Sequence, residues 1–141
     1  MRNLFCFLLT LGVMSAHAQS APSFSAPKNA VSQLEDLKEL TKSVAVTKPS
    51  KSKLQAEARP DINRMLVLAA DDFLRITSEK PSKEAYLQCL DRDLARVAPL
   101  TTDAQDRKEV AQYFQELMEI VGLESSEGRL SVFAGTPDTK Q

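Results

Sequence analysis

The chain has 141 residues, 26% of them charged, and its 18 basic and 19 acidic side chains give a formal net charge of −1. A charge this close to neutral lacks the basic excess that typifies nucleic-acid binding. The length suits one modest domain, and two cysteines and a single histidine restrict the chemistry that it can carry.

The first eighteen residues have the pattern of a secretory signal peptide. Arg2 precedes an apolar run from Leu4 to Met14, and Ala16-His17-Ala18 forms an A-x-A cleavage signal. The run is too short for a transmembrane helix, which takes about 20 residues. We therefore predict that residues 1–18 are removed and that no membrane span remains. The product would be exported, to the periplasm in a Gram-negative cell and otherwise to the medium.

Removal of the leader changes the available chemistry, because Cys6 and His17 leave with it. A chain without histidine cannot perform serine–histidine or cysteine–histidine catalysis, and it cannot hold zinc through imidazole. We expect no cofactor and no metal site. Cys89 then has no disulfide partner within the chain, and we expect it to be a small buried hydrophobic residue. The alternative is an exposed thiol that links two molecules.

The residues that follow divide into a leader, a helix and a linker. Residues 19–28 are rich in proline and serine, which predicts disorder. Residues 29–46 predict an amphipathic helix with a single apolar stripe. Residues 47–59 are polar and basic, which predicts a linker. The stripe, which must dock on the core, pair with a second copy or bind a partner, consists of Val31, Leu34, Leu37, Leu40 and Val44.

Residues 60–141 predict a helical core domain of three main helices and a short C-terminal one. Pro60 suits the first turn of a helix that extends to Thr77. Ser82 is the expected N-cap of a second helix that ends at Val97. The apolar faces are Ile62, Met65, Leu66, Ala69, Phe73 and Ile76 in the first helix, and Tyr86, Leu87, Leu90, Leu94 and Val97 in the second.

The third core helix is expected to begin at Thr102, which stands in capping-box spacing with Gln105. Its apolar positions recur at helical steps and are Val110, Phe114, Leu117 and Val121. No segment sustains the alternation of a strand, so the predicted fold class is all-α, a small helical bundle preceded by a tethered amphipathic helix.

The stretch that follows contains a stop signal and a start signal for helices. Gly122 predicts a left-handed helix end. Ser125 or Ser126 is expected to cap a short helix with Glu127 in its first turn. This helix would return three apolar residues to the core, namely Leu130, Val132 and Phe133.

The C-terminal forty residues resemble the signature of a bacterial domain family of unknown function. The resemblance lies in an acidic D-R pair, a tyrosine–phenylalanine helix, the run V-G-L-E-S-S-x-G and a short apolar end. The matching positions are Asp106, Arg107, Tyr113, Phe114, Val121, Gly122, Leu123, Glu124, Ser125, Ser126 and Gly128. The ending "VFAGTPD" departs from the aromatic ending of that family. The resemblance implies a small helical domain and carries no known reaction.

Small size and missing catalytic groups favour a module that binds another macromolecule. The partner would be an envelope protein, and the chain would be an inhibitor or immunity-type protein of an envelope enzyme. The expected interaction surface is the turn formed by Glu124, Ser125, Ser126, Glu127 and Gly128, together with adjacent acidic helix faces.

Two other functions remain open. A carboxylate-dependent envelope enzyme, with Glu124 or Glu116 as base, would need convergent carboxylates in one concave pocket. A structural protein would self-associate through residues 29–46. We predict a binding function over an enzymatic one.

Overall fold

The computed structural model describes the backbone of residues 23–47 and 53–135. The expected signal peptide, residues 1–18, lies outside this part. The elements in chain order are α1 (Ala30–Thr47), α2 (Lys53–Glu79), α3 (Lys83–Val97), the 3₁₀ turn η1 (Ala98–Leu100), α4 (Ala104–Val121) and α5 (Arg129–Ala134). The described part contains no strand, so the all-α prediction is confirmed.

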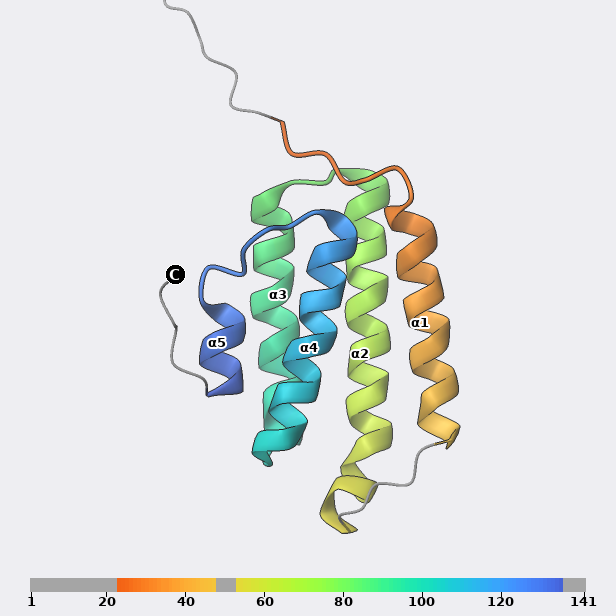
Figure 1. The fold of residues 1–141 in the computed structure, drawn as a ribbon, viewed down its shortest axis with the longest axis vertical. Coiled ribbons are helices and arrows are strands. Elements are labelled where there is room, and N and C mark those ends of the chain that lie inside the picture. Colours follow the sequence, from red (N-terminus) through yellow and green to blue (C-terminus); the bar gives the residue numbers. More distant parts are fainter. Residues whose placement is uncertain (1–22, 48–52, 136–141) are drawn as a thin grey trace, which may run out of the picture.

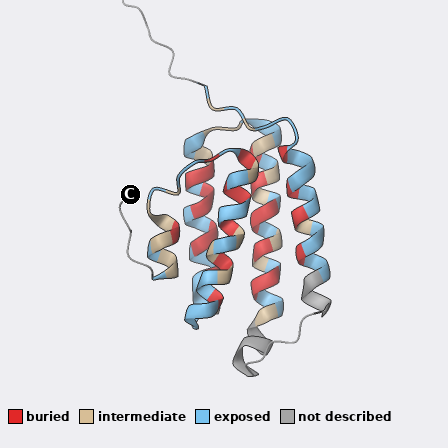
Figure 2. Ribbon diagram, in the orientation of Figure 1, coloured by how far each residue is buried: buried red, intermediate tan, exposed pale blue. Residues whose placement is uncertain are grey.

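Helices α1 to α4 run alternately up and down, side by side, and the short α5 lies against the flank of this bundle (Figure 1). The buried residues line the inward faces of the helices, and the outward faces are exposed (Figure 2). None of the described helices combines the length and apolar character that crossing a membrane requires.

The predicted apolar faces of α2, α3 and α4 form the core. Its largest fully buried side chains include Phe73, Tyr86 and Phe114. The rings of Phe73 and Tyr86 lie 5.3 Å apart between centroids. The Tyr86 hydroxyl is 2.8 Å from Oγ1 of Thr77, which satisfies the polar end of this buried ring.

Helix α1 docks on the same core, which is the first of the three possibilities for residues 29–46. Leu34 and Leu37 are 0% and 8% exposed and belong to the central apolar cluster. Lys38 adds an ion pair of 2.9 Å with Asp71 of α2. Leu40 is 58% exposed, so the apolar stripe is buried in only part of its length.

The linker prediction for residues 47–59 is wrong from Lys53 onward. Helix α2 begins at Lys53 and continues through Pro60, which therefore lies inside the helix and not at its first turn. Proline costs a helix one backbone hydrogen bond, but it does not prevent residues on its N-terminal side from being helical. Residues 48–52 lie outside the described part.

The prediction of a disordered leader does not hold for residues 23–28. The ring of Phe24 packs 5.5 Å from that of Tyr86 between centroids. The amide of Ala30 donates to the carbonyl of Pro27 at 3.0 Å, which leads the segment into α1. The segment crosses the end of the bundle at which α1 begins (Figure 1). Its one large apolar residue is therefore partly buried against the core.

The N-terminal caps agree with the predictions at one helix and differ at the other. Ser82 accepts from the amide of Ala85 at 3.1 Å, as predicted for α3. The cap of α4 is Asp103, whose carboxylate accepts from the amide of Gln105 at 2.6 Å. The capping box expected at Thr102 is therefore wrong by one residue, because an aspartate serves as cap equally well.

Gly122 ends α4 as predicted. It has a φ of +75°, and the amide of Leu123 donates to the carbonyl of Met118 at 2.8 Å. This 6→1 hydrogen bond belongs to the Schellman motif, in which a left-handed residue closes a helix. The chain then turns back toward α3 and α5.

Candidate functional site

A cavity of about 240 Å³ opens between α1, α2 and α4. Its lining consists of Leu37, Leu40, Thr41, Arg59, Ile62, Asn63, Leu66, Asp106, Glu109, Val110, Tyr113 and Glu116. Apolar walls with a few convergent polar groups are typical of ligand sites. We refer to this feature as the α1–α2–α4 cavity.

Asn63 is a polar side chain of the cavity without a partner. It is 8% exposed and lies on α2 between the buried residues Ile62 and Leu66. Its amide makes no hydrogen bond within the described chain. In the described chain, every side-chain nitrogen or oxygen that is shielded from solvent has a hydrogen-bond partner. Since the Asn63 amide has no such partner, it meets solvent through the cavity. A ligand that entered the cavity would displace that solvent, and it would have to bond to the amide to avoid a cost of about 1–3 kcal/mol.

Asp106 is a buried carboxylate with one weak partner. It is 4% exposed and lies in the first turn of α4. The nearest cation among the described residues is Arg59, whose Nη2 is 3.9 Å from Oδ1. The same guanidinium donates through Nη1 to Oε2 of Glu109 at 2.8 Å. Asp106 therefore has little hydration and no close donor.

The surroundings of Asp106 raise the pKa of its carboxyl group. Burial is the main cause, and the neighbouring carboxylates Asp103 and Glu109 act in the same direction. The guanidinium of Arg59 opposes them. A cation placed in the cavity would also oppose them, because it favours the charged form.

Tyr113 links the three helices that form the cavity. Its hydroxyl donates to the carbonyl of Leu66 in α2 at 3.1 Å and lies 3.3 Å from the hydroxyl of Thr41 in α1. Burial raises the pKa of Tyr113 to about 12. The phenol therefore stays protonated near neutral pH and acts as a fixed hydrogen-bonding group.

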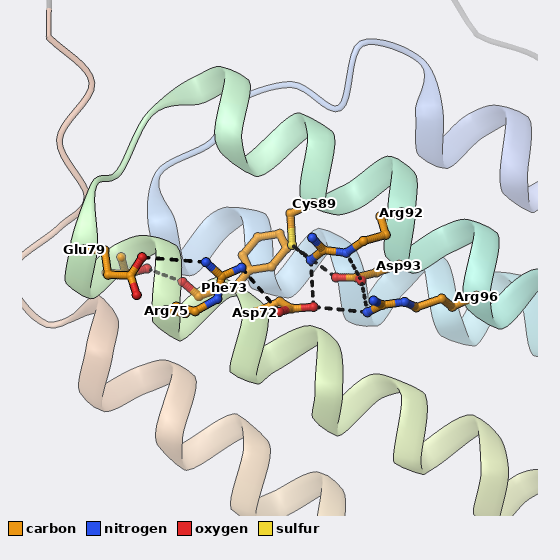
Figure 3. A network of polar contacts seen from close by, with 9 residues as sticks. Asp72, Phe73, Arg75, Glu79, Cys89, Arg92, Asp93 and Arg96 are labelled. Carbon is orange, nitrogen blue, oxygen red and sulfur yellow. Dashed lines mark hydrogen bonds and ion pairs between the residues drawn. The ribbon is translucent and has the colours of Figure 1, made fainter.

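A second polar cluster joins α2 to α3, and Figure 3 shows its geometry. Asp72 accepts from Arg92 at 2.7 Å and from Arg96 at 3.2 Å. Asp93 accepts from the same two guanidiniums at 3.3 and 3.0 Å. The thiol of Cys89 donates to the other oxygen of Asp93 at 3.1 Å.

This cluster fits a structural network better than a metal site. Ligand atoms of Asp72, Cys89 and Asp93 lie within 4.8 Å of one another, a spacing that suits a cation. Both carboxylates, however, are already neutralised by arginine. Burial and the adjacent Asp93 raise the pKa of the Cys89 thiol, whereas a metal ligand must be a thiolate. Cys89 is 2% exposed, so its predicted burial is confirmed.

The expected interaction surface, residues 124–128, forms a turn whose polar groups bond mainly to residues beside it. The hydroxyl of Ser125 accepts from the amide of Glu127 at 3.0 Å. The hydroxyl of Ser126 lies 3.4 Å from the amide of Leu130, a long contact. The carboxylate of Glu127 pairs with Lys83 at 2.7 Å and with Arg129 at 3.3 Å. Glu124 is exposed beside them.

The helix expected after this turn differs in two respects. Helix α5 begins at Arg129, and its N-cap is Gly128, which offers no side-chain oxygen. Glu127 precedes the helix with a φ of +53° and is not in its first turn as predicted. Neither serine is the N-cap residue, although the hydroxyl of Ser126 accepts from the amide of Leu130 at 3.4 Å. Val132 is 81% exposed and does not return to the core. Leu130 and the half-buried Phe133 do so, because they lie on the face of α5 that meets the bundle.

The carboxylates proposed for catalysis are separated. Glu116 lines the α1–α2–α4 cavity together with Asp106. Glu124 lies at a different hollow, which it lines with Phe24 and Lys83. Of the two bases considered, only Glu116 therefore shares a concave site with another carboxylate.

Sequence reasoning missed three residues of the cavity. Arg59 fell in the expected linker, and Asp106 entered only through the family resemblance. Asn63 carried a usable signal, because it is an amide flanked by Ile62 and Leu66 in an otherwise apolar helical region. A polar residue at the edge of such a stripe is worth testing as a buried group.

Comparison with known proteins gives a family and no activity. The model of a family described as a domain of unknown function, DUF4844, matches residues 25–137. No curated protein and no solved structure matches the chain. The expected membership of a family of unknown function is thus confirmed at the level of the family, and this match does not bear on the V-G-L-E-S-S-x-G signature.

Proposed function

The chain belongs to the DUF4844 family, a domain of unknown function, and from this premise we propose that it is an exported binding module whose site is the α1–α2–α4 cavity. The observation that carries the proposal is the amide of Asn63, which is 8% exposed, has no hydrogen-bond partner among the described residues and meets solvent through that cavity. Side chains buried to this extent are normally bonded within the protein. A ligand that bonds to the amide in place of solvent is the simplest reason for its presence.

The size of the cavity favours a group presented by a macromolecule. Pockets for drug-sized molecules measure about 300–1,000 Å³, and this one measures about 240 Å³. It suits one projecting side chain, as at the centre of a protein–protein interface. We therefore propose that the partner is another envelope protein. Binding of this kind is how an inhibitor or immunity-type protein would act.

Export rests on the leader pattern of residues 1–18, and self-association through α1 has less support. Leu34 and Leu37 are already buried within the same molecule. Among the described side chains of the stripe, Leu40, at the cavity, and Val31 are exposed. These two side chains are a small surface for a stable dimer, which buries about 800 Å² on each partner.

The test uses the exposed wall of the cavity. Replacing Leu40 by arginine places a charge at the cavity without disturbing the core, since Leu40 is 58% exposed. The matched control is Val132→Arg, at an 81% exposed position on α5. The chain without residues 1–18 and both variants are immobilised, exposed to envelope extract and analysed by mass spectrometry.

We expect one partner to be retained by the unsubstituted chain and by the Val132 variant and to be lost with Leu40→Arg. Circular dichroism verifies the fold of each chain. Equal retention by all three chains would move the site away from the cavity. Absence of any specific partner with an intact fold would contradict the binding function.

A second candidate is the carboxylate-dependent enzyme, favoured by Asp106 and Glu116 in one cavity and by the raised pKa of Asp106. The mass of the captured partner separates the two functions. An unchanged mass supports binding alone. A cleaved or modified partner that appears with the unsubstituted chain and not with Asp106→Asn supports catalysis.

A further inference from the structure

We infer that the α1–α2–α4 cavity receives a cationic group on an aliphatic stem, the side chain of an arginine or lysine of the partner protein. This inference rests on the proposed function and adds the chemistry of the group that is bound. Three observations support it: the unpartnered amide of Asn63, the charges of the lining and the apolar walls.

The charges of the described lining favour a cation. Asp106, Glu109 and Glu116 are acidic, and Arg59 is the basic residue among them. Arg59 is engaged by Glu109 at 2.8 Å, whereas its distance to Asp106 is 3.9 Å. The carboxylate of Asp106 accordingly lacks a close donor. An incoming ammonium or guanidinium would provide one to a carboxylate that is only 4% exposed, where such pairs are stronger than in solution.

The amide of Asn63 fits the same ligand. Its oxygen accepts hydrogen bonds, and a guanidinium carries five N–H donors in a planar fork. Asn63 and Asp106 come from different helices and line one cavity. One guanidinium could therefore donate to the Asn63 oxygen and to the Asp106 carboxylate, which the neighbouring Arg59 does not do within hydrogen-bonding distance.

The walls fit the stem of such a side chain. Arginine and lysine bury their methylene groups against apolar surface and keep the charged end in a polar setting. Leu37, Ile62 and Val110 offer that surface, and Leu40 continues it toward solvent.

Other ligands meet specific costs in this cavity. An anion would approach Asp106, Glu109 and Glu116, and Arg59, the one cation of the described lining, is already engaged by Glu109. A wholly apolar group would bury Asn63 and Asp106 further without giving either a bond. Both cases add an uncompensated desolvation cost of about 1–3 kcal/mol or more.

The direct test uses blocked amino acids as probes for the chain from Gln19 to Gln141. N-acetyl-arginine methylamide and its lysine equivalent carry the charge. The citrulline equivalent has nearly the shape of the arginine probe without the charge, and the norleucine equivalent has the stem alone. Binding is followed by NMR through the side-chain amide of Asn63 and the backbone amide of Val110.

We expect the two cationic probes to shift both signals in a saturable way, and the citrulline probe to bind at least about tenfold more weakly. Asp106→Asn should weaken the binding of the arginine probe by at least about tenfold. The matched control Asp36→Asn, at an exposed position of α1, should leave its affinity unchanged. Equal binding of the arginine and citrulline probes, or no effect of Asp106→Asn, would overturn the inference.

The probe experiment and the capture experiment together distinguish failure of this inference from failure of the proposed function. If no probe binds while Leu40→Arg still abolishes capture of the partner, the cavity is the site and the ligand class is wrong. If capture is also unaffected by Leu40→Arg, both proposals are contradicted.

Discussion

Two buried aspartates of this protein have opposite surroundings. Asp93, 3% exposed, is held by two guanidiniums and a thiol. Asp106, 4% exposed, has one guanidinium at 3.9 Å. Burial of a charge stabilises a fold only when its partners offset the loss of hydration. The same substitution at the two positions should therefore have opposite effects on stability.

Asp106→Asn should maintain or increase the free energy of unfolding near neutral pH. Folding raises the pKa of this carboxyl above the reference value of 3.8, so its charged form is disfavoured in the native state. The stabilising contribution of the acid form is present at low pH and is lost as pH rises through the raised pKa. We expect a gain of up to about 1 kcal/mol near pH 7 and less near pH 3. Urea denaturation at both pH values measures the difference, and a loss confined to pH 7 would contradict the argument.

Asp93→Asn should destabilise the protein by about 2 kcal/mol. Arg92 and Arg96 each pair with two carboxylates, Asp72 and Asp93, and the substitution removes the charge of the second. It also weakens the acceptor of the Cys89 thiol. The same urea titration measures it. A free energy of unfolding that is unchanged or increased, as expected for Asp106→Asn, would mean that the network adds nothing to stability.

At the scale of the helices, local sequence signals predicted the elements well where the signal acts over one turn. The Ser82 cap and the Gly122 stop are such signals, and both are confirmed. The start of α2 was misplaced because a polar and basic segment looks the same in a linker and in an exposed helical end. The Gly128 cap of α5 was missed because the two preceding serines offered more familiar caps.

The end of α4 provides a test at this scale. Gly122→Ala should cost about 1–2 kcal/mol, because a side chain disfavours its left-handed conformation. An added Cβ would lie 3.5 Å from Cδ of Pro27, which is ordinary contact, so crowding adds little. Gly135→Ala is the control, since its φ is +68° and nothing lies within 4 Å of an added Cβ. Thermal unfolding compares the two, and a much larger cost at Gly122 would show that the contact with Pro27 matters.

At the scale of the whole molecule, the sequence predicted helices and an all-α class but not the cavity. The apolar stripe of residues 29–46 required a partner surface, and periodicity alone did not show that the core of the same molecule provides one, which is seen in the docking of α1 on α2. Asn63, Arg59 and Asp106 are separated by up to 47 positions in the chain, and only the packing of α4 beside α2 brings them together. Periodicity within one helix does not predict which residues of different helices will line the same cavity.

The integration of α1 into the bundle predicts a contrast between two leucines. Leu34→Ala should cost about 3 kcal/mol, because a fully buried side chain leaves a cavity. Leu40→Ala should change the free energy of unfolding by no more than about 0.5 kcal/mol, because its side chain is 58% exposed. Urea denaturation of both variants tests this. Small effects at both positions would mean that α1 is a tether and not part of the fold.

The position of residues 23–29 also determines which end of the bundle can be attached to a surface without covering the cavity. These residues cross the end of the bundle where α1 begins, whereas the cavity is lined by later residues of α1 and by the early turns of α2 and α4, farther along the helix axes (Figure 1). A molecule held through residues 23–29 would therefore have the cavity displaced along the helix axes from the point of attachment. A tag, a bead or a fused domain at this end of the bundle would leave the residues of the cavity accessible.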